Sequence, residues 1–396
     1  MRSFLSSSPR PIIGAGWFAN IVSTSILASI FRPSLPLMPT NSNRQYGSAR
    51  VLLTTDAMAT RFELLMYGTD ATRLRSAGEE ALEEIERLER QLSVYQIESE
   101  LSGVNANAAK NPVSVSVGLF RLLERAQSLW HITGGAFDIT VAPLLQCWDF
   151  MGGTGTMPTD AAVAEARDRV GMPHIILDAS QFAVSFDRGG MMLDLGAIGK
   201  GYAIEKAVEI LRENGVVSAL LHGGTSTVYG LGSPPDAPAW TIAIQSPNLS
   251  GDQLAAEQHT EDPKNKVWNE PENTTYGHPL AHVELRDSAL SVSAPHGKAF
   301  FSGGVRYGHV LDPREGYPAS SSSLLSAVVS ASATDSDALS TALLLEGAGG
   351  LSRIAARYEG FHGLVASEDE KGEMRVDKFD LWERQSHTRS TGSKQD

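Results

Sequence analysis

Residues 191–203, MMLDLGAIGKGYA, lead from an apolar segment through a glycine-rich turn into a helical pattern. The pattern predicts a strand over 191–195, a turn at Gly196 and a helix over about 200–214. Glycines let the backbone approach a ligand closely, and the start of a helix offers free N–H donors to an anion. Because the stretch has the spacing of neither the Walker nor the dinucleotide fingerprint, a ligand-binding turn and a tight turn with a capping aspartate both stay open.

The segments on either side of this stretch predict strands that pair locally and helices that do not strictly alternate with them. Strands are expected at 51–55, 61–67, 174–178, 181–186, 217–221 and 324–330, and helices at 71–93, 117–131, 160–170 and 335–347. In the helix at 71–93, apolar residues recur at steps of three and four, and the opposite face is charged. We therefore predict one α+β domain.

Composition excludes some functions. The 396 residues are 42% hydrophobic and 20% charged, which is ordinary for a globular protein. A net charge of -13 repels nucleic-acid phosphate, so we expect no nucleic-acid partner. The single cysteine, Cys147, can form neither an internal disulfide nor a thiolate metal site, and we expect it to be a small buried residue beside Trp148.

The ends of the chain differ from its middle. Residues 1–50 contain arginines but no acidic residue, and an apolar stretch over 11–31 predicts a signal peptide, a membrane anchor, a transit peptide or a disordered leader. Export or membrane association and a cytoplasmic location therefore both stay open. We expect a folded domain over 51–384 with a polar surface insertion near 250–280, and a polar tail over 385–396.

A polar helix start contains the strongest pattern for a metal. Asp337 and Thr341 are four residues apart and share one face of a helix. A carboxylate and a hydroxyl are hard oxygen ligands that suit Mg²⁺, which often shares a site with a phosphate. The alternative is structural: Asp335 or Ser336 caps the helix, and Asp337 favours its dipole.

A histidine precedes the turn at 312–316, where Pro313 presets φ and Gly316 closes the loop. His309 stands at the mouth of this loop, a position that suits either a general base or a purely structural side chain.

Several motifs occur in the order typical of one family. They are Met58-Ala59-Thr60, Ser93-Val94-Tyr95 with Glu98-Ser99-Glu100-Leu101 and Asn105, Gly135-Ala136-Phe137-Asp138, the stretch 194–203, His309-Val310-Leu311-Asp312-Pro313, and Asp337-Ala338-Leu339-Ser340-Thr341-Ala342. Each is common by chance, but the ordered set, from about Met58 to Glu346, resembles the FAD:protein FMN transferase family, often called ApbE.

The resemblance implies a single ApbE-like domain of mixed, largely antiparallel sheet packed with helices. It also implies a reaction in which FMN moves from FAD to a threonine or serine hydroxyl of an acceptor flavoprotein subunit, with Mg²⁺, and AMP is released. The implied FAD contacts are Met58, Tyr95, Ala136, Phe137, Asp138, Asp194 and Lys200. The implied Mg²⁺ ligands are the backbone carbonyl of Ala197, with Asp337 and Thr341, and His309 matches the histidine that activates the acceptor.

The chain departs from the family pattern at two places. Gly223-Gly224-Thr225 stands where the family usually has Gly-Gly-Asp, and Ser293-Ala294-Pro295-His296 stands where it commonly has Thr-Ser-Gly-Asp.

Two alternative functions stay open. One is an FAD pyrophosphatase, in which water replaces the acceptor and the products are FMN and AMP. The other is a non-catalytic FAD-binding accessory protein, which Thr225 in place of the carboxylate would favour.

Overall fold

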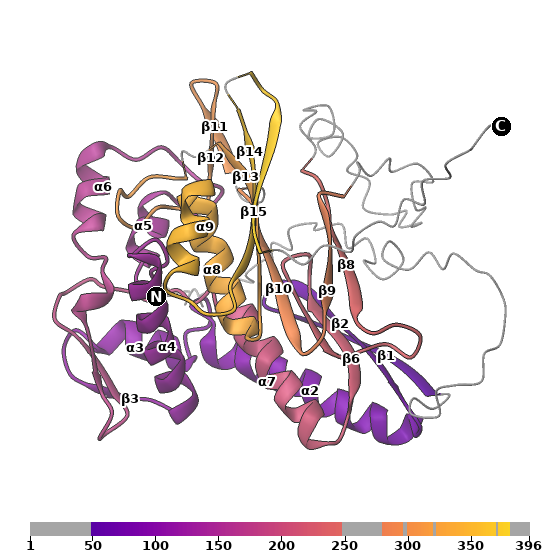
Figure 1. Ribbon diagram of the computed structural model, residues 1–396. Helices are drawn as coiled ribbons and strands as arrows, with labels where there is room; N and C mark the ends of the chain where they lie inside the picture. The colour runs from indigo at the N-terminus through magenta and orange to yellow at the C-terminus, as the bar shows by residue number, and fades with distance from the viewer. Residues whose placement is uncertain (1–48, 248–278, 296–298, 320–321, 370, 381–396) are drawn as a thin grey trace, which may run out of the picture.

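The computed structural model describes residues 49–247, 279–295, 299–319, 322–369 and 371–380 (Figure 1). Nearly all of the predicted leader and insertion, and the whole predicted tail, lie outside these residues. Within the described ranges, no helix is both long enough and apolar enough to cross a membrane.

An eight-stranded sheet forms the centre of the molecule (Figure 1). Its strands, in order across the sheet, are β1 (Ala49–Ala57), β2 (Thr60–Gly68), β6 (Ser218–Gly223), β7 (Thr227–Gly232), β10 (Ser288–Ser293), β13 (Ser323–Ser330), β14 (His362–Glu368) and β15 (Met374–Phe379). All pairings between these strands are antiparallel. Together with the helices, this confirms the predicted α+β class.

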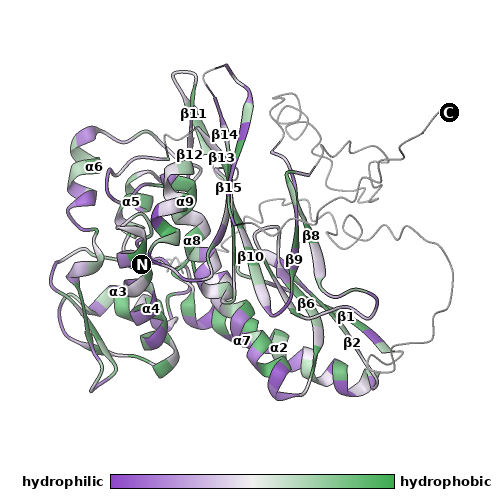
Figure 2. Ribbon diagram, in the orientation of Figure 1, coloured by the Kyte–Doolittle hydropathy of each residue, from purple (hydrophilic) through white to green (hydrophobic). Residues whose placement is uncertain are grey.

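Helices cover one face of this sheet and a hairpin covers the other. The helices are α2 (Ala71–Leu92), α7 (Gly199–Glu213), α8 (Ala333–Glu346) and α9 (Ala348–Ala355), and the hairpin is β8 (Trp240–Ile244) with β9 (Ala281–Leu285). Side chains of successive β2 residues point to opposite faces, so Leu64 packs with the helices and Leu65 with the hairpin. The helix α2 shows the predicted division into apolar and charged residues (Figure 2).

A smaller lobe lies beside the helical layer (Figure 1). It contains α3 (Glu100–Asn107), α4 (Val117–Thr133), α5 (Ala142–Cys147), α6 (Asp160–Arg167), η1 (Met172–His174) and a sheet of β3 (Val113–Ser114), β5 (Ala183–Phe186) and β4 (Ile175–Asp178). The hairpin of β11 (Ala299–Ser302) and β12 (Val305–Gly308) packs Phe300 and Tyr307 on Trp148. Cys147 borders the same cluster but is half-buried, so the expectation that it is buried is wrong.

The strand predicted at 191–195 is wrong. Met191, Leu193 and Leu195 are buried as a strand pattern requires, but the segment pairs with no strand among the described residues. Its backbone is satisfied otherwise: the N–H of Leu193 donates to Asn105 Oδ1 over 2.7 Å, and the N–H of Asp194 donates to the Ile139 carbonyl over 2.7 Å. Alternating burial thus marks an extended chain here without showing that a ladder forms.

The predicted cap of the helix beginning near 335 also needs correction. Ser332 is the N-cap of α8, and its hydroxyl accepts the N–H of Asp335. The helix therefore begins two residues earlier than predicted, and neither Asp335 nor Ser336 has the capping role.

Candidate active site

The second turn of α8 carries a buried carboxylate, that of Asp337. Gly201, in the first turn of α7, donates its backbone N–H to Asp337 Oδ2 over 3.0 Å. The hydroxyl of Thr227, at the start of β7, donates to Oδ1 over 3.3 Å. Two neutral donors therefore hold the carboxylate where two helices and a strand meet.

Close contact between α7 and α8 brings these groups together. A Cβ atom built on Gly201 would lie 2.1 Å from the carbonyl oxygen of Ala333 and 2.8 Å from Cβ of Asp337. Any side chain at position 201 would push the two helices apart. The absence of a side chain at Gly201 therefore serves the close packing of α7 on α8.

No lysine, arginine or histidine of the described chain forms an ion pair with Asp337. Removing a charged carboxylate from water costs several kcal/mol unless a cation or enough hydrogen bonds compensate for it. The charge balance at Asp337 therefore favours an added cation, and its hard oxygen atoms fit Mg²⁺.

The other two predicted metal ligands lie near Asp337 in the fold. Thr341 is one turn further along α8, and its hydroxyl lies 3.2 Å from that of Ser293 on β10. Ala197 lies in the turn just before α7, the helix whose Gly201 bonds Asp337. The described residues contain no group of three His, Cys, Asp or Glu side chains that could hold a metal. Ala197, Asp337 and Thr341 would thus provide one carboxylate and two neutral oxygens, which suits a cation that takes further ligands from a phosphate.

The turn before α7 places Asp194 and Lys200 together. Asp194 Oδ1 accepts the N–H of Gly196 over 2.8 Å, and Lys200 Nζ donates to the Gly196 carbonyl over 3.3 Å. Burial raises the pKa of Asp194 above its usual value, while the Gly196 N–H and the charge of Lys200 act in the opposite direction. The turn therefore combines a half-buried acid with a nearby cation, as expected for a site that binds a charged ligand.

The Gly135–Asp138 motif follows α4, whose end is marked by Gly134 in the left-handed conformation. Ala136 and Phe137 are buried, so their side chains belong to the core and only their backbone is suited to ligand contact. Asp138 is also buried, and burial raises its pKa. Both of its oxygens already accept hydrogen bonds, Oδ1 from the N–H and hydroxyl of Thr140 and Oδ2 from the N–H of Met172.

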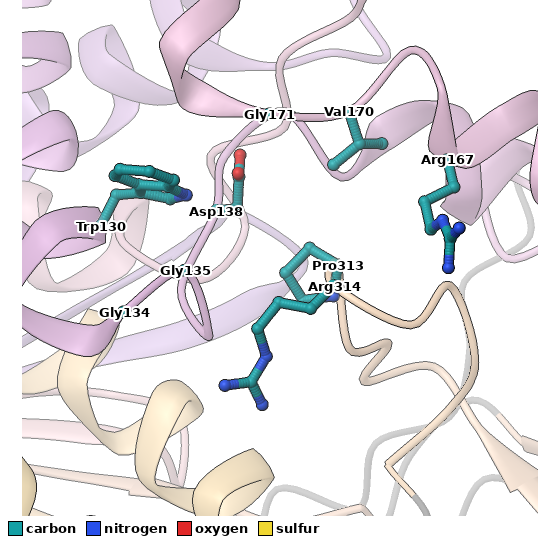
Figure 3. Close-up of a pocket in the computed structure, with 9 residues that line it drawn as sticks. All are labelled: Trp130, Gly134, Gly135, Asp138, Arg167, Val170, Gly171, Pro313 and Arg314. Carbon is teal, nitrogen blue, oxygen red and sulfur yellow. The ribbon is translucent and has the colours of Figure 1, made fainter.

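A pocket of about 460 Å³ opens beside Asp138 (Figure 3). Trp130 and Gly135 form one wall, and Arg167 and the turn at Arg314 form the others. The segment that carries Asp138 is hydrogen-bonded through Ile139 to the backbone of Asp194, so the pocket is close to the turn before α7.

The hairpin turn between β1 and β2 is strained. Met58 and Ala59 have φ of 51° and 57°, a conformation that this two-residue turn requires but that side chains disfavour. The N–H of Met58 donates to Glu89 on α2 over 2.8 Å. The turn packs closely on Gly224, since a Cβ atom there would lie 2.2 Å from Thr60 Oγ1. Thr225, which replaces the usual family carboxylate, is exposed next to this contact.

Two predicted residues lie on surface segments around this site. Tyr95 follows α2, is largely exposed and is within electrostatic reach of Asp194. His309 follows β12 directly and is half-buried. The stacked pair of Phe300 and Tyr307 anchors its hairpin on Trp148. This anchoring sets where the chain enters the segment that carries His309.

Several residues of the site have no signal in the sequence. Thr227 lies in none of the predicted strands, and Ser293 is named only where the chain departs from the family motif. Trp130 is one of the apolar residues of the helix expected at 117–131. Arg167 and Arg314 resemble solvent-exposed charges. Only the packing of α4, α6 and the 312–316 turn brings Trp130, Arg167 and Arg314 around one pocket.

Comparison with solved structures finds the same fold in two ApbE proteins. The ApbE protein of Thermotoga maritima matches with a TM-score of 0.67 and 24% identity, over 83% of this chain and 97% of that one. The Pseudomonas stutzeri flavinyl transferase ApbE, in its apo form, matches with a TM-score of 0.68 and 24% identity, over 86% and 97%. The fold is therefore that of the ApbE flavin transferases.

Sequence comparison gives the family. A FAD:protein FMN transferase of Treponema pallidum is 28% identical over 313 residues, which are 76% of this chain and 80% of that protein. One from Klebsiella pneumoniae is 28% identical over 304 residues, which are 76% and 83%. The model of the ApbE family matches residues 58–364. The chain belongs to the ApbE family.

Proposed function

We propose that this ApbE-family enzyme transfers FMN from FAD to a threonine or serine hydroxyl of an acceptor flavoprotein subunit, with Mg²⁺, and releases AMP. Family membership and the FAD:protein FMN transferases among its relatives support the enzyme class and FAD as the substrate. The magnesium requirement rests on one observation: Asp337 is a buried carboxylate with only neutral partners in the described structure.

Asp337, Thr341 and the carbonyl of Ala197 would hold the Mg²⁺. When bound, the ion supplies positive charge against the diphosphate of FAD and against the leaving AMP. Gly201 and Thr227 orient the carboxylate through their hydrogen bonds, and Ser293 orients the hydroxyl of Thr341.

Residues around the turn before α7 would bind FAD. Lys200 offers a cation for the diphosphate beside the half-buried Asp194. The strained turn at Met58 and the backbone of Ala136 and Phe137 offer main-chain groups. Asp138 would act mainly by holding its loop in place, because the protein already bonds both of its oxygens, and Tyr95 would contact the ligand from the exposed side.

His309 is the proposed general base. Its imidazole takes the proton of the acceptor hydroxyl, whose oxygen bonds to the phosphorus of the FMN half. The bond from that phosphorus to the oxygen that joins it to AMP breaks, and AMP leaves with the electron pair. The product is FMN joined to the acceptor by a phosphoester.

A transfer assay tests this function. The enzyme is incubated with FAD, Mg²⁺ and a candidate acceptor, and mass spectrometry measures the flavin-bearing acceptor while AMP is quantified. We expect His309→Asn to keep FAD binding but to lower transfer by roughly 100- to 10,000-fold. The matched control is His282→Asn, at an exposed position on β9, which should transfer at the normal rate.

Two results would count against the proposal. Release of AMP and free FMN with every acceptor tested would identify an FAD pyrophosphatase. A stable, FAD-binding His309→Asn variant with normal transfer would remove His309 from the mechanism.

A further inference from the structure

The two arginines at the pocket differ in their partners. Arg314 is neutralised by two carboxylates: its Nη2 lies 2.6 Å from Asp312 Oδ2, and its Nη1 pairs with Glu346. The guanidinium of Arg167, the last residue of α6, forms no hydrogen bond or ion pair with any residue that the structure describes. The pocket therefore has a guanidinium that is available to an anionic ligand, and it belongs to Arg167 (Figure 3).

The opposite wall of the pocket is aromatic and is held in place. The indole nitrogen of Trp130 points toward the buried carboxyl group of Asp138 (Figure 3). Gly135 follows the helix with φ of 85°, and a Cβ atom there would lie 3.4 Å from Trp130 Nε1, so the glycine leaves the indole accessible. An indole fixed in this way suits a flat aromatic ring, either stacked or edge to face.

The size of the pocket limits its occupant. About 460 Å³ lies near the lower end of the roughly 300–1,000 Å³ typical of small-molecule sites. An aromatic wall and a free guanidinium on opposite sides together match an aromatic ring that carries a phosphate.

We propose that Trp130 and Arg167 are specificity-determining residues that take one mononucleotide half of FAD, with its ring against Trp130 and its phosphate on Arg167. The inference rests on the proposed function, which supplies FAD as the ligand. AMP and FMN share the required chemistry, and binding measurements can distinguish which of them occupies the pocket.

Titration calorimetry of the full chain with AMP, adenosine, FMN and riboflavin tests the inference. We expect Arg167→Ala to weaken either AMP or FMN, but not both, by roughly 10- to 100-fold, the size of a lost charge-assisted contact. The corresponding ligand without phosphate, adenosine or riboflavin, should bind to Arg167→Ala as tightly as to the wild type. The control is Arg169→Ala. It also removes one positive charge, two residues from Arg167, but the Arg169 side chain pairs with Glu165 and does not line the pocket.

Trp130 is tested with the same ligands. Trp130→Leu should lower the affinity for the mononucleotide that depends on Arg167 on the order of tenfold, and should do the same for its nucleoside without phosphate. Trp130→Phe should retain most of the affinity for both. Melting temperatures of all variants separate lost contacts from misfolding.

The inference is overturned if Arg167→Ala leaves both AMP and FMN unchanged, if it weakens both equally, or if Arg169→Ala has the same effect. Flavin transfer does not enter these titrations. An enzyme that binds through Arg167 but transfers no flavin would refute only the proposed function, and one that transfers flavin without this dependence would refute only the pocket assignment.

Discussion

Asp335 and Asp337 lie two residues apart on α8 and are each only 4% exposed, but their partners differ in charge. Arg125 binds Asp335 with two parallel hydrogen bonds, the first of 2.7 Å from Nε, and Tyr358 donates its hydroxyl over 2.6 Å. From the residues that the structure describes, the carboxylate of Asp337 receives only the Gly201 N–H and the Thr227 hydroxyl. The two acids are therefore equally buried on one helix, but Asp335 has an ion-pair partner and Asp337 has only neutral ones.

The difference separates a structural acid from a candidate ligand. Asp335 joins α4, α8 and the segment after α9, and its ion pair needs nothing from outside the chain. Burial, and next the charge of Asp335, raise the pKa of Tyr358, so its hydroxyl remains a donor. A carboxylate as buried as Asp337, with no cation beside it in the described part of the chain, is instead the position where an external cation gains most.

The largest expected effect follows from substitution of Asp337. Asp337→Asn keeps the shape of the side chain but removes its charge, so AMP release from FAD should fall on the order of a thousandfold or more. The free energy of unfolding without metal should stay nearly the same, because the substitution also removes a buried charge. Normal AMP release by this variant, or by Asp337→Ala, at low Mg²⁺ would show that Asp337 is not a metal ligand.

Magnesium should separate the two acids in a stability measurement. At a Mg²⁺ concentration of about 100 times Kd, binding to the native state adds about 2.7 kcal/mol to the free energy of unfolding. Urea denaturation with and without MgCl₂ should show this gain in the wild type and in Asp335→Asn but not in Asp337→Asn. Equal stabilisation of all three proteins would place the ion elsewhere.

Asp335→Asn should lower stability without metal. It leaves the Arg125 guanidinium without its carboxylate, and because that side chain is 40% exposed, solvent screening reduces the loss to about 1–2 kcal/mol. Urea denaturation measures this loss, and the double variant Arg125→Met with Asp335→Asn should recover part of it. If the double variant is as unstable as the sum of the two single ones, the pair is not coupled.

The smallest effect concerns a third buried group, His222. It lies 3.4 Å from Glu63 on the neighbouring strand, and burial lowers its pKa although Glu63 acts in the opposite direction. Since the folded pKa is below the unfolded value of about 6.5, stability is present above that pH and is lost as the pH falls through the folded pKa. Between pH 7 and 5, the free energy of unfolding of His222→Gln should fall by about 1 kcal/mol less than that of the wild type. The control His282→Gln, at an exposed position, should show the same pH dependence as the wild type. Identical pH profiles for the wild type and His222→Gln would contradict this expectation.

Local patterns were sufficient for most elements of the fold. The amphipathic periodicity of α2 and the helix expected at 117–131 are properties of short stretches, and both agree with the structure. The exception at 191–195 is instructive, because its alternating burial is real but its hydrogen-bond partners are a side-chain amide and a distant carbonyl. Periodicity reports burial, whereas a strand also needs a neighbour.

The sequence by itself determined which residue types stand four apart on α8, the order of the motifs and the turns that carry them, because these depend on local spacing. Only the tertiary structure decided which acid has a cation. Arg125 and Asp335 are 210 residues apart in the chain, and Gly201 and Asp337 are 136 apart. Charge balance at a buried group depends on what packs against it from distant segments, and no local pattern encodes that arrangement.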